Sequence, residues 1–197
     1  MTRLILASTS RYRRDLLARL KVEFSTVAPE LDERALPDEP PLALAARLAL
    51  AKAKSVSASE ALVIGSDQVA SLHGRVLSKP GSHAAALAEL SACQGQSVDF
   101  HTAAAIVDAA GGRVWQTVDH TRVRFASLAE TVLDAYLHAE RPYDCAGGFK
   151  AEGLGIGLFT EIESRDPTAL IGLPLIWVAA TLRAAGLEPL AGRTDRR

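Results

Sequence analysis

The sequence has 197 residues, of which 48% are hydrophobic and 23% are charged, and its formal net charge is −1. These proportions are ordinary for a globular protein, and they exclude a disordered chain and a disulfide-stabilised scaffold. The balanced charge also argues against a general nucleic-acid-binding protein, because affinity for the phosphate backbone needs a broad excess of Lys and Arg. We expect one folded unit over residues 1–191 and a frayed tail over residues 192–197.

Neither a membrane span nor a secretion signal is predicted. No apolar run reaches the roughly 18 residues that span a bilayer, and the apolar stretch at residues 4–7 is too short for a signal peptide. We therefore expect a cytoplasmic protein. Its only cysteines, Cys93 and Cys145, are expected to be reduced and mostly buried thiols. The five histidines show no ligand-like spacing among themselves or with a cysteine, so the sequence does not predict a zinc site.

Charge is distributed unevenly near the start of the chain. Residues 1–21 hold six basic residues and one acid, whereas residues 22–40 hold six acids and one base. A basic patch and an acidic patch around one cleft would suit a polyphosphate held together with a divalent cation.

The first quarter of the chain predicts a strand, a turn and two helices. Residues 3–7 are an apolar run, residues 8–10 are a hydroxyl-rich turn, and leucines then recur at helical spacing. A second apolar run at residues 22–28 leads into an acidic, Pro-rich loop. The Ala/Leu-rich segment 42–55 is expected to be a helix, because its apolar residues gather on one face.

The middle of the chain predicts a covered strand and a helix. Residues 62–65 are continuously apolar, and Asp67 and Gln68 follow where such a strand would end at an exposed edge. Ser82 is placed to cap a helix that runs to about Cys93.

Two longer β-like stretches, residues 97–108 and 113–125, are expected to pair antiparallel through a turn at residues 110–112. Ser127 and Glu130 have the spacing of a capping box, which predicts a helix over residues 128–139.

The last third of the chain predicts a loop and a helix. Residues 145–157 contain five glycines, which is typical of a loop whose backbone approaches something closely. A final helix is expected from about Pro174 to the residue before Gly186.

The turn after the first strand resembles an anion site. The hydroxyls of Ser8 and Ser10, the free amides of a helix start and the Arg13 guanidinium can converge on phosphate oxygens. Taken alone, such a segment is more often a helix cap with a solvated face.

Several charged residues allow both a chemical and an ordinary interpretation. Asp67 can be a metal-binding carboxylate or a base that orients water, or a turn residue that caps the next segment. Glu30 and Glu33 lie in the acidic loop, where a solvated charge run is the simpler interpretation. Lys79 can neutralise a phosphate, although exposed loop lysines are equally common.

The glycine-rich segment fits neither a P-loop nor a dinucleotide-binding fingerprint. Its Lys150 and Glu152 can read the edge of a base, and the alternative is a tight turn with two solvated charges. Taken one by one, these motifs predict only an α/β enzyme that handles phosphate.

Taken together and in order, the motifs resemble the Maf family over roughly residues 3–186. The matching segments are Leu-Ala-Ser-Thr-Ser-x-x-Arg-Arg at residues 6–14, Pro29–Glu33, Ala51–Lys54, Gly65–Gln68, Ser78–Pro80 and Gly172–Leu175. The resemblance implies a two-lobed α/β fold, similar to that of ITPases, with a mixed central sheet flanked by helices and a substrate cleft between the lobes. It also implies a possible homodimer and a divalent metal, Mg²⁺ or Mn²⁺, used to hydrolyse nucleoside triphosphates to monophosphate and pyrophosphate.

Within the family, the chain is similar to the branch that acts on 7-methyl-GTP. Tyr12 stands where that branch carries an aromatic residue and the dTTP/UTP branch carries arginine, and Glu152 matches the specificity glutamate. Gln68 matches the third specificity position but does not separate the branches. Two positions depart from the family: Arg11 replaces a frequent proline, and Gly148 replaces a frequent serine near the base.

The resemblance gives these residues roles that suit a cationic base. N7-methylation makes guanine cationic, so the Tyr12 face can attract it while the Glu152 carboxylate accepts from the base donors. The resemblance also assigns side chains to binding of the triphosphate and to the hydrolysis step. Arg13, Lys52 and Lys79 neutralise phosphates, Ser8 and Ser10 bind them, Asp67 accepts the proton of the attacking water, and Glu30, Glu33 and Asp67 hold the metal.

Two alternative functions remain at this stage. The first is a dTTP/UTP pyrophosphatase with the same catalytic residues. The second is a regulator of cell division that acts by binding a partner, because Maf relatives are named for inhibiting septum formation.

Overall fold

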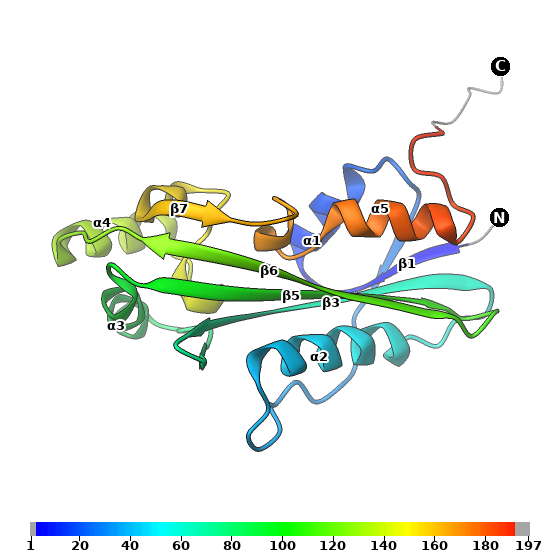
Figure 1. The fold of residues 1–197 in the computed structure, drawn as a ribbon, viewed down its shortest axis with the longest axis horizontal. Helices are drawn as coiled ribbons and strands as arrows, with labels where there is room; N and C mark the ends of the chain where they lie inside the picture. Colours follow the sequence, from blue (N-terminus) through cyan, green and yellow to red (C-terminus); the bar gives the residue numbers. More distant parts are fainter. Residues whose placement is uncertain (1–2, 192–197) are drawn as a thin grey trace.

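The computed structural model describes residues 3–191, and within this range seven strands form one mixed sheet with five α-helices around it (Figure 1). The predicted tail at residues 192–197 lies outside the described range. The strands are β1 (Arg3–Ala7), β2 (Ser25–Val27), β3 (Ala61–Leu72), β4 (Arg75–Leu77), β5 (Ser97–Asp108), β6 (Val114–Phe125) and β7 (Phe159–Glu163). The α-helices are α1 (Arg11–Ala18), α2 (Pro41–Ser55), α3 (His83–Cys93), α4 (Glu130–Glu140) and α5 (Leu175–Ala184). Short 3₁₀ helices cover residues 146–148, 154–158 and 169–171.

The sheet combines a parallel part with an antiparallel part. Its strand order is β2-β1-β3-β5-β6-β7, and β4 pairs with the far end of β3. Strand β1 runs parallel to both β2 and β3, whereas β3, β5, β6 and β7 pair antiparallel in sequence. The expected α/β fold with a mixed central sheet and flanking helices is confirmed.

Alternating side chains place helices on both faces of the parallel part. Leu4 and Leu6 pack in one cluster with residues of α1 and α5, while Ile5 and Ala7 pack in another with Ala53 of α2. Successive strand residues point to opposite faces, so a continuously apolar strand must be covered on both. Figure 1 shows α2 on one side of the sheet and α1 with α5 on the other.

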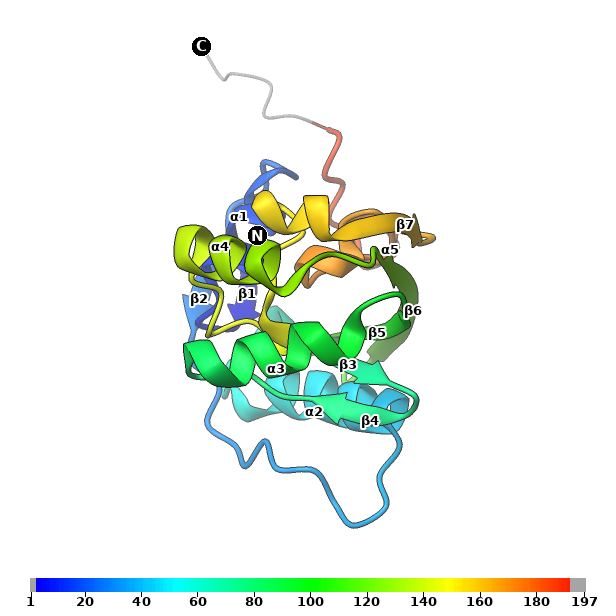
Figure 2. The same cartoon turned by 90° about the vertical axis from the view of Figure 1, so that its left-hand side faces the viewer.

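Two hydrophobic cores lie toward opposite ends of the long strands. Strand β3 gives Leu62 and Ile64 to the core beneath α1 and α5, and gives Ala70 and Leu72 to a second core. That second core packs beneath α3 and α4, which lie beside each other at one end of the molecule (Figure 2). The long strands therefore join two lobes.

Most of the predicted elements are confirmed. The first strand and helix, the helix in segment 42–55, the helix capped by Ser82, the β5–β6 hairpin and the final helix all form. Ser82 accepts a hydrogen bond from the Ala85 amide at 3.3 Å, as expected of an N-cap.

Two expectations at element ends are wrong. Strand β3 does not end near Asp67 but continues to Leu72, because β4 and β5 supply antiparallel partners beyond the end of β1. The capping box is also absent: α4 begins at Glu130, its N-cap is Ala129, and no side chain caps it. Strand β7 was not expected, since all but the first of its five residues are exposed.

Gly65 sets how closely α2 approaches the sheet. A Cβ atom at this position would lie 2.2 Å from the Ala49 carbonyl oxygen and 2.5 Å from the Ala53 amide nitrogen, both in the α2 backbone. A backbone cannot yield as a flexible side chain does, so Gly65→Ala must push the helix away. We expect a loss of about 1–3 kcal/mol in the free energy of unfolding, measured by chemical denaturation.

Gly157→Ala is the matched control, because a Cβ atom there would meet nothing within 4 Å. Equal denaturation midpoints for the two variants would contradict this account of the helix–sheet contact.

Candidate active site

The turn between β1 and α1 forms one wall of the site. The Ser8 hydroxyl is buried and accepts from the Ser10 amide at 3.1 Å, while the Ser10 hydroxyl caps α1 by accepting from the Arg13 amide at 3.4 Å. Both hydroxyls therefore shape the turn, and each keeps its own proton for another acceptor. The start of α1 also presents backbone N–H groups, which favour an anion.

Arg13 is held by a loop residue from the last part of the chain. Its Nε atom donates to the Gly172 carbonyl at 3.0 Å, which ties α1 to the loop before α5. Burial lowers the pKa of the Arg13 guanidinium, and the negative charges of Asp67 and Glu33 oppose that shift. An arginine stays charged under such shifts, so the site keeps a fixed cation here.

A buried lysine joins two carboxylates at the centre of the site. Lys52 Nζ donates to Asp67 Oδ1 at 2.6 Å and to Glu33 Oε2 at 2.9 Å. The Lys52 and Asp67 side chains are 7% and 10% exposed, whereas the Glu33 side chain is 54% exposed. The three residues come from α2, from β3 and from the acidic loop, so only the tertiary fold brings them together.

Gln68 is fixed by hydrogen bonds that leave its oxygen free to accept. Its Nε2 atom lies 2.9–3.0 Å from Thr102 Oγ1 and from the carbonyls of Ala169 and Leu170. The neighbouring Ser66 hydroxyl is buried against Gly172 O at 2.9 Å. These contacts join β3 to the 3₁₀ turn at residues 169–171.

The glycine-rich segment is anchored by an aromatic cluster. The Phe149 ring packs edge-on against the rings of Phe100, Phe125 and Phe159, with centroids 5.0–5.4 Å apart. Each such pair contributes about 0.5–1.5 kcal/mol beyond its buried area. Gly148 adopts a φ of +71°, a conformation that favours glycine, so a serine would be strained there.

These walls enclose a cleft of about 490 Å³ that opens to solvent. It lies where the two lobes meet, because its lining includes the β1–α1 turn together with Phe100 and Phe149 of the second core. The predicted site residues that line it are Ser8, Ser10, Tyr12, Arg13, Glu33, Lys52, Gln68, Lys79 and Glu152.

Three predicted residues lie elsewhere. Asp67 is not part of the lining but sits directly behind Lys52. Glu30 is exposed and does not line the cleft, although Pro29 and Glu33 of the same loop do. Lys150 Nζ donates to the Glu140 carbonyl at 3.2 Å, outside the lining, so it is not placed to read a base.

The face of Tyr12 is partly occupied. The Arg11 guanidinium lies 4.8 Å from the Tyr12 ring centroid, and its Nη2 donates to the Tyr12 hydroxyl at 2.9 Å. The sequence identified Arg11 only as a departure from a frequent proline. A cationic base that stacks on Tyr12 must therefore share or displace this guanidinium.

The cleft also contains a thiol that stays protonated. Burial raises the pKa of Cys145 to about 11 and does the same to Cys93. Because the thiolate is the nucleophilic form, Cys145 is not an activated nucleophile at neutral pH. Both cysteines are free, as expected from the sequence.

Three residues with metal-ligating side chains were missed by sequence reasoning. One ligand atom each of His83, Asp134 and His138 lie within 4.8 Å of one another, away from the cleft lining. The signal was the spacing of Asp134 and His138, four residues apart on one helix face.

Comparison with known proteins identifies the family of this chain. A family model described as "Maf-like protein" matches residues 3–185. The chain belongs to the Maf family. Among the described residues of this Maf protein, no helix is long and apolar enough to cross a membrane.

Its relatives include three proteins that carry the same name. Proteins called 7-methyl-GTP pyrophosphatase from Burkholderia pseudomallei (strain 1710b) and Xanthomonas axonopodis pv. citri (strain 306) are 56% and 54% identical to it. The alignments cover 96% and 95% of this chain and 90% and 99% of those proteins. One from Albidiferax ferrireducens is 50% identical over 95% of this chain and 96% of its own.

A solved structure of a HAM1 protein from Coxiella burnetii aligns with this Maf protein at a TM-score of 0.45 and 15% identity. The alignment covers 65% of this chain and 75% of that chain. A likeness this weak carries no argument about fold or activity.

Proposed function

We propose that this Maf protein hydrolyses 7-methyl-GTP to 7-methyl-GMP and pyrophosphate in the cytoplasm. The observation that supports this most is the composition of the cleft, which combines fixed cations with an aromatic ring and the Glu152 carboxylate. The names of the 50–56% identical relatives support the same substrate. We also infer that residues 1–191 work as one catalytic domain, because the long strands belong to both lobes.

The phosphate groups would lie against the β1–α1 turn. Arg13 offers a guanidinium fixed by Gly172, and Lys79 lies on the lining from the loop after β4. The helix start and the two serine hydroxyls add donors to the same wall. Preorganised donors of this kind stabilise charge that develops on a leaving pyrophosphate.

Asp67 would accept the proton of the attacking water. Water adds to phosphorus, the bond to the bridging oxygen between the α- and β-phosphates breaks, and that oxygen leaves with its electron pair. The Asp67 carboxylate is held at 2.6 Å by Lys52, which itself lines the cleft. A positioned carboxylate is a suitable general base for this step.

The carboxylates fit a hard divalent cation. Glu33 and Asp67 approach one ammonium group, which shows that their oxygens converge. Mg²⁺ is usually bound by one or two carboxylates together with substrate phosphates, and Mn²⁺ accepts the same ligands. We assign the cation to Glu33 and Asp67, because both carboxylates contact the Lys52 ammonium, and not to the exposed Glu30. When bound, such an ion would neutralise and polarise the phosphate oxygens.

The base would lie between Tyr12 and the glycine-rich segment. N7-methylation gives guanine a positive charge, which the Tyr12 ring can attract and the Glu152 carboxylate can complement while it accepts from the base N–H groups. Asp144 also lines this part of the cleft and adds a second acidic group that suits a cationic base.

The function is tested by incubating the protein with Mg²⁺ or Mn²⁺ and a panel of 7-methyl-GTP, GTP, dTTP, UTP and ITP, and measuring pyrophosphate. Highest kcat/KM on 7-methyl-GTP supports the proposal. Highest kcat/KM on dTTP or UTP would keep the catalytic residues but overturn the substrate. An absence of turnover on every nucleotide would favour a regulatory role through binding.

Glu152→Gln tests the base-recognition part separately. A hydrogen bond to a charged group is worth about 1.5–3 kcal/mol, so kcat/KM for 7-methyl-GTP should fall by about tenfold to a hundredfold. The value for dTTP should hardly change. Glu163→Gln is the control, since Glu163 is an exposed carboxylate of β7 outside the cleft. Equal losses on both nucleotides would show that Glu152 does not read the base.

A further inference from the structure

A group of metal-ligating side chains lies away from the cleft, at the α3–α4 end of the molecule (Figures 1 and 2). His83 is the first residue of α3, and Asp134 and His138 lie one turn apart on α4. None of the three lines the cleft, whereas Glu33 and Lys52, the partner of Asp67, both do.

Asp134 bridges the two histidines. Its Oδ1 atom lies 2.7 Å from His83 Nε2, and its Oδ2 atom lies 3.4 Å from His138 Nδ1. The two imidazole rings are 4.5 Å apart between centroids. One ligand atom of each residue lies within 4.8 Å of the others, and side-chain rotation would bring each to the roughly 2.0–2.2 Å that separates Zn²⁺ from nitrogen or oxygen ligands.

A tyrosine contacts the His83 nitrogen that does not face Asp134. The Tyr143 hydroxyl lies 3.0 Å from His83 Nδ1 and 3.3 Å from the Leu137 carbonyl, so when it donates to that carbonyl its oxygen can accept from an Nδ1–H group. In neutral His83 that carries its hydrogen on Nδ1, the lone pair is on Nε2, where a metal would bind. Without a metal, the 2.7 Å contact is a hydrogen bond from Nε2–H to Asp134 Oδ1, and a bound ion would take the place of that hydrogen.

We propose that His83, Asp134 and His138 bind one divalent transition-metal ion of the Zn²⁺ class. Two imidazoles and a carboxylate form a donor set that binds such ions in preference to Mg²⁺. A water molecule would complete four-coordination. His138 Nδ1 would exchange its 3.0 Å contact with the Asp134 carbonyl for the metal. Tyr143 acts as the outer partner that orients His83.

Metal bound at this site would stabilise one wall of the cleft. It links α3 to α4, and the Tyr143 carbonyl accepts from the Gly81 amide at 3.0 Å. Asp144, the next residue, lines the cleft, and Lys79 lies two residues before Gly81. A bound ion would therefore raise the melting temperature and stiffen both loops.

The test is a titration of the metal-stripped, nucleotide-free protein with Zn²⁺, measured by calorimetry and by native mass spectrometry. Wild type is expected to bind one ion more than His83→Ala and His138→Ala, and its melting temperature should rise with Zn²⁺ where theirs does not. Equal stoichiometry in wild type and both variants, or no binding by wild type, would overturn the proposal.

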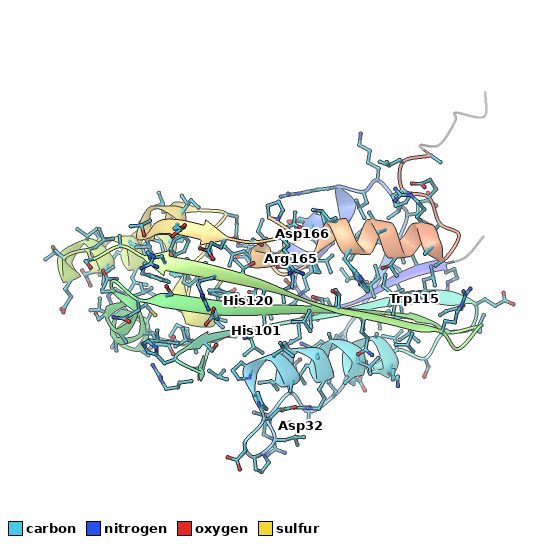
Figure 3. All side chains as sticks on the ribbon, in the orientation of Figure 1. Asp32, His101, Trp115, His120, Arg165 and Asp166 are labelled. Carbon is cyan, nitrogen blue, oxygen red and sulfur yellow. The ribbon has the colours of Figure 1, made fainter. Side chains whose placement is uncertain are left out.

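Two control variants distinguish this site from the cleft carboxylates and from a second histidine pair. Asp67→Asn should keep the ion, which excludes the cleft carboxylates. His120→Ala should also keep the ion, because His120 belongs to a different histidine pair. His120 on β6 stacks with His101 on β5, with 5.2 Å between the ring centroids (Figure 3). Tyr143→Phe removes no ligand, yet it should weaken Zn²⁺ affinity by about 10–100-fold. Unchanged affinity in Tyr143→Phe would remove the outer-partner role.

Discussion

Asp67→Asn is expected to reduce kcat for pyrophosphate release from 7-methyl-GTP by about 100-fold to 10,000-fold, the usual contribution of a general base. Asparagine keeps the shape of the side chain and an oxygen that can accept from Lys52, so the fold should persist. It cannot accept the proton of the attacking water. The measurement is steady-state release of pyrophosphate, with circular dichroism to confirm that the variant is folded.

Glu30→Gln is the matched control for that variant. Glu30 is a carboxylate of the acidic loop that does not line the cleft, so its removal should leave kcat near the wild-type value. If Asp67→Asn kept wild-type turnover, the proton-acceptor role would be lost. If both variants lost activity alike, the loss would not be specific to Asp67.

Lys52→Met is expected to have the largest effect on stability. It preserves side-chain volume but removes the ammonium that Asp67 and Glu33 share, and Asp67 is then a buried carboxylate without its partner. Breaking a buried ion pair from one side costs about 3–5 kcal/mol. Denaturant unfolding should therefore show a large loss for Lys52→Met and almost none for Lys54→Met, an exposed lysine of the same helix.

A double variant separates the ion pair from simple packing. Lys52→Met combined with Asp67→Leu replaces both charges by apolar groups, which is often neutral in buried pairs. We expect it to recover most of the stability that Lys52→Met loses, while remaining inactive. A double variant as unstable as the sum of its single changes would show that the two residues are not energetically coupled.

The sequence predicts the parts of this fold that depend on local periodicity. The strand at residues 3–7, the helix capped by Ser10 and the helix in segment 42–55 each carry their own pattern of apolar residues. The hairpin of β5 and β6 is predictable because a two-glycine turn separates two β-like runs.

The site is less predictable because its contacts are made between distant elements. The order of the motifs identified most cleft residues, but Lys52 meets Asp67 only because α2 packs on β3 at Gly65. The end of β3 was misjudged for the same reason: the strand is prolonged by partners that lie far along the chain. The capping box failed because Ala129, not Ser127, takes the N-cap position.

The substrate of the cleft is the central claim, and one competition experiment tests it most directly. Equimolar 7-methyl-GTP and dTTP are incubated together with the wild-type protein and Mg²⁺, and the two monophosphates are quantified early in the reaction. Their ratio equals the ratio of the two kcat/KM values. We predict an excess of 7-methyl-GMP, and an excess of dTMP would contradict the assignment of Tyr12 and Glu152 to a cationic base.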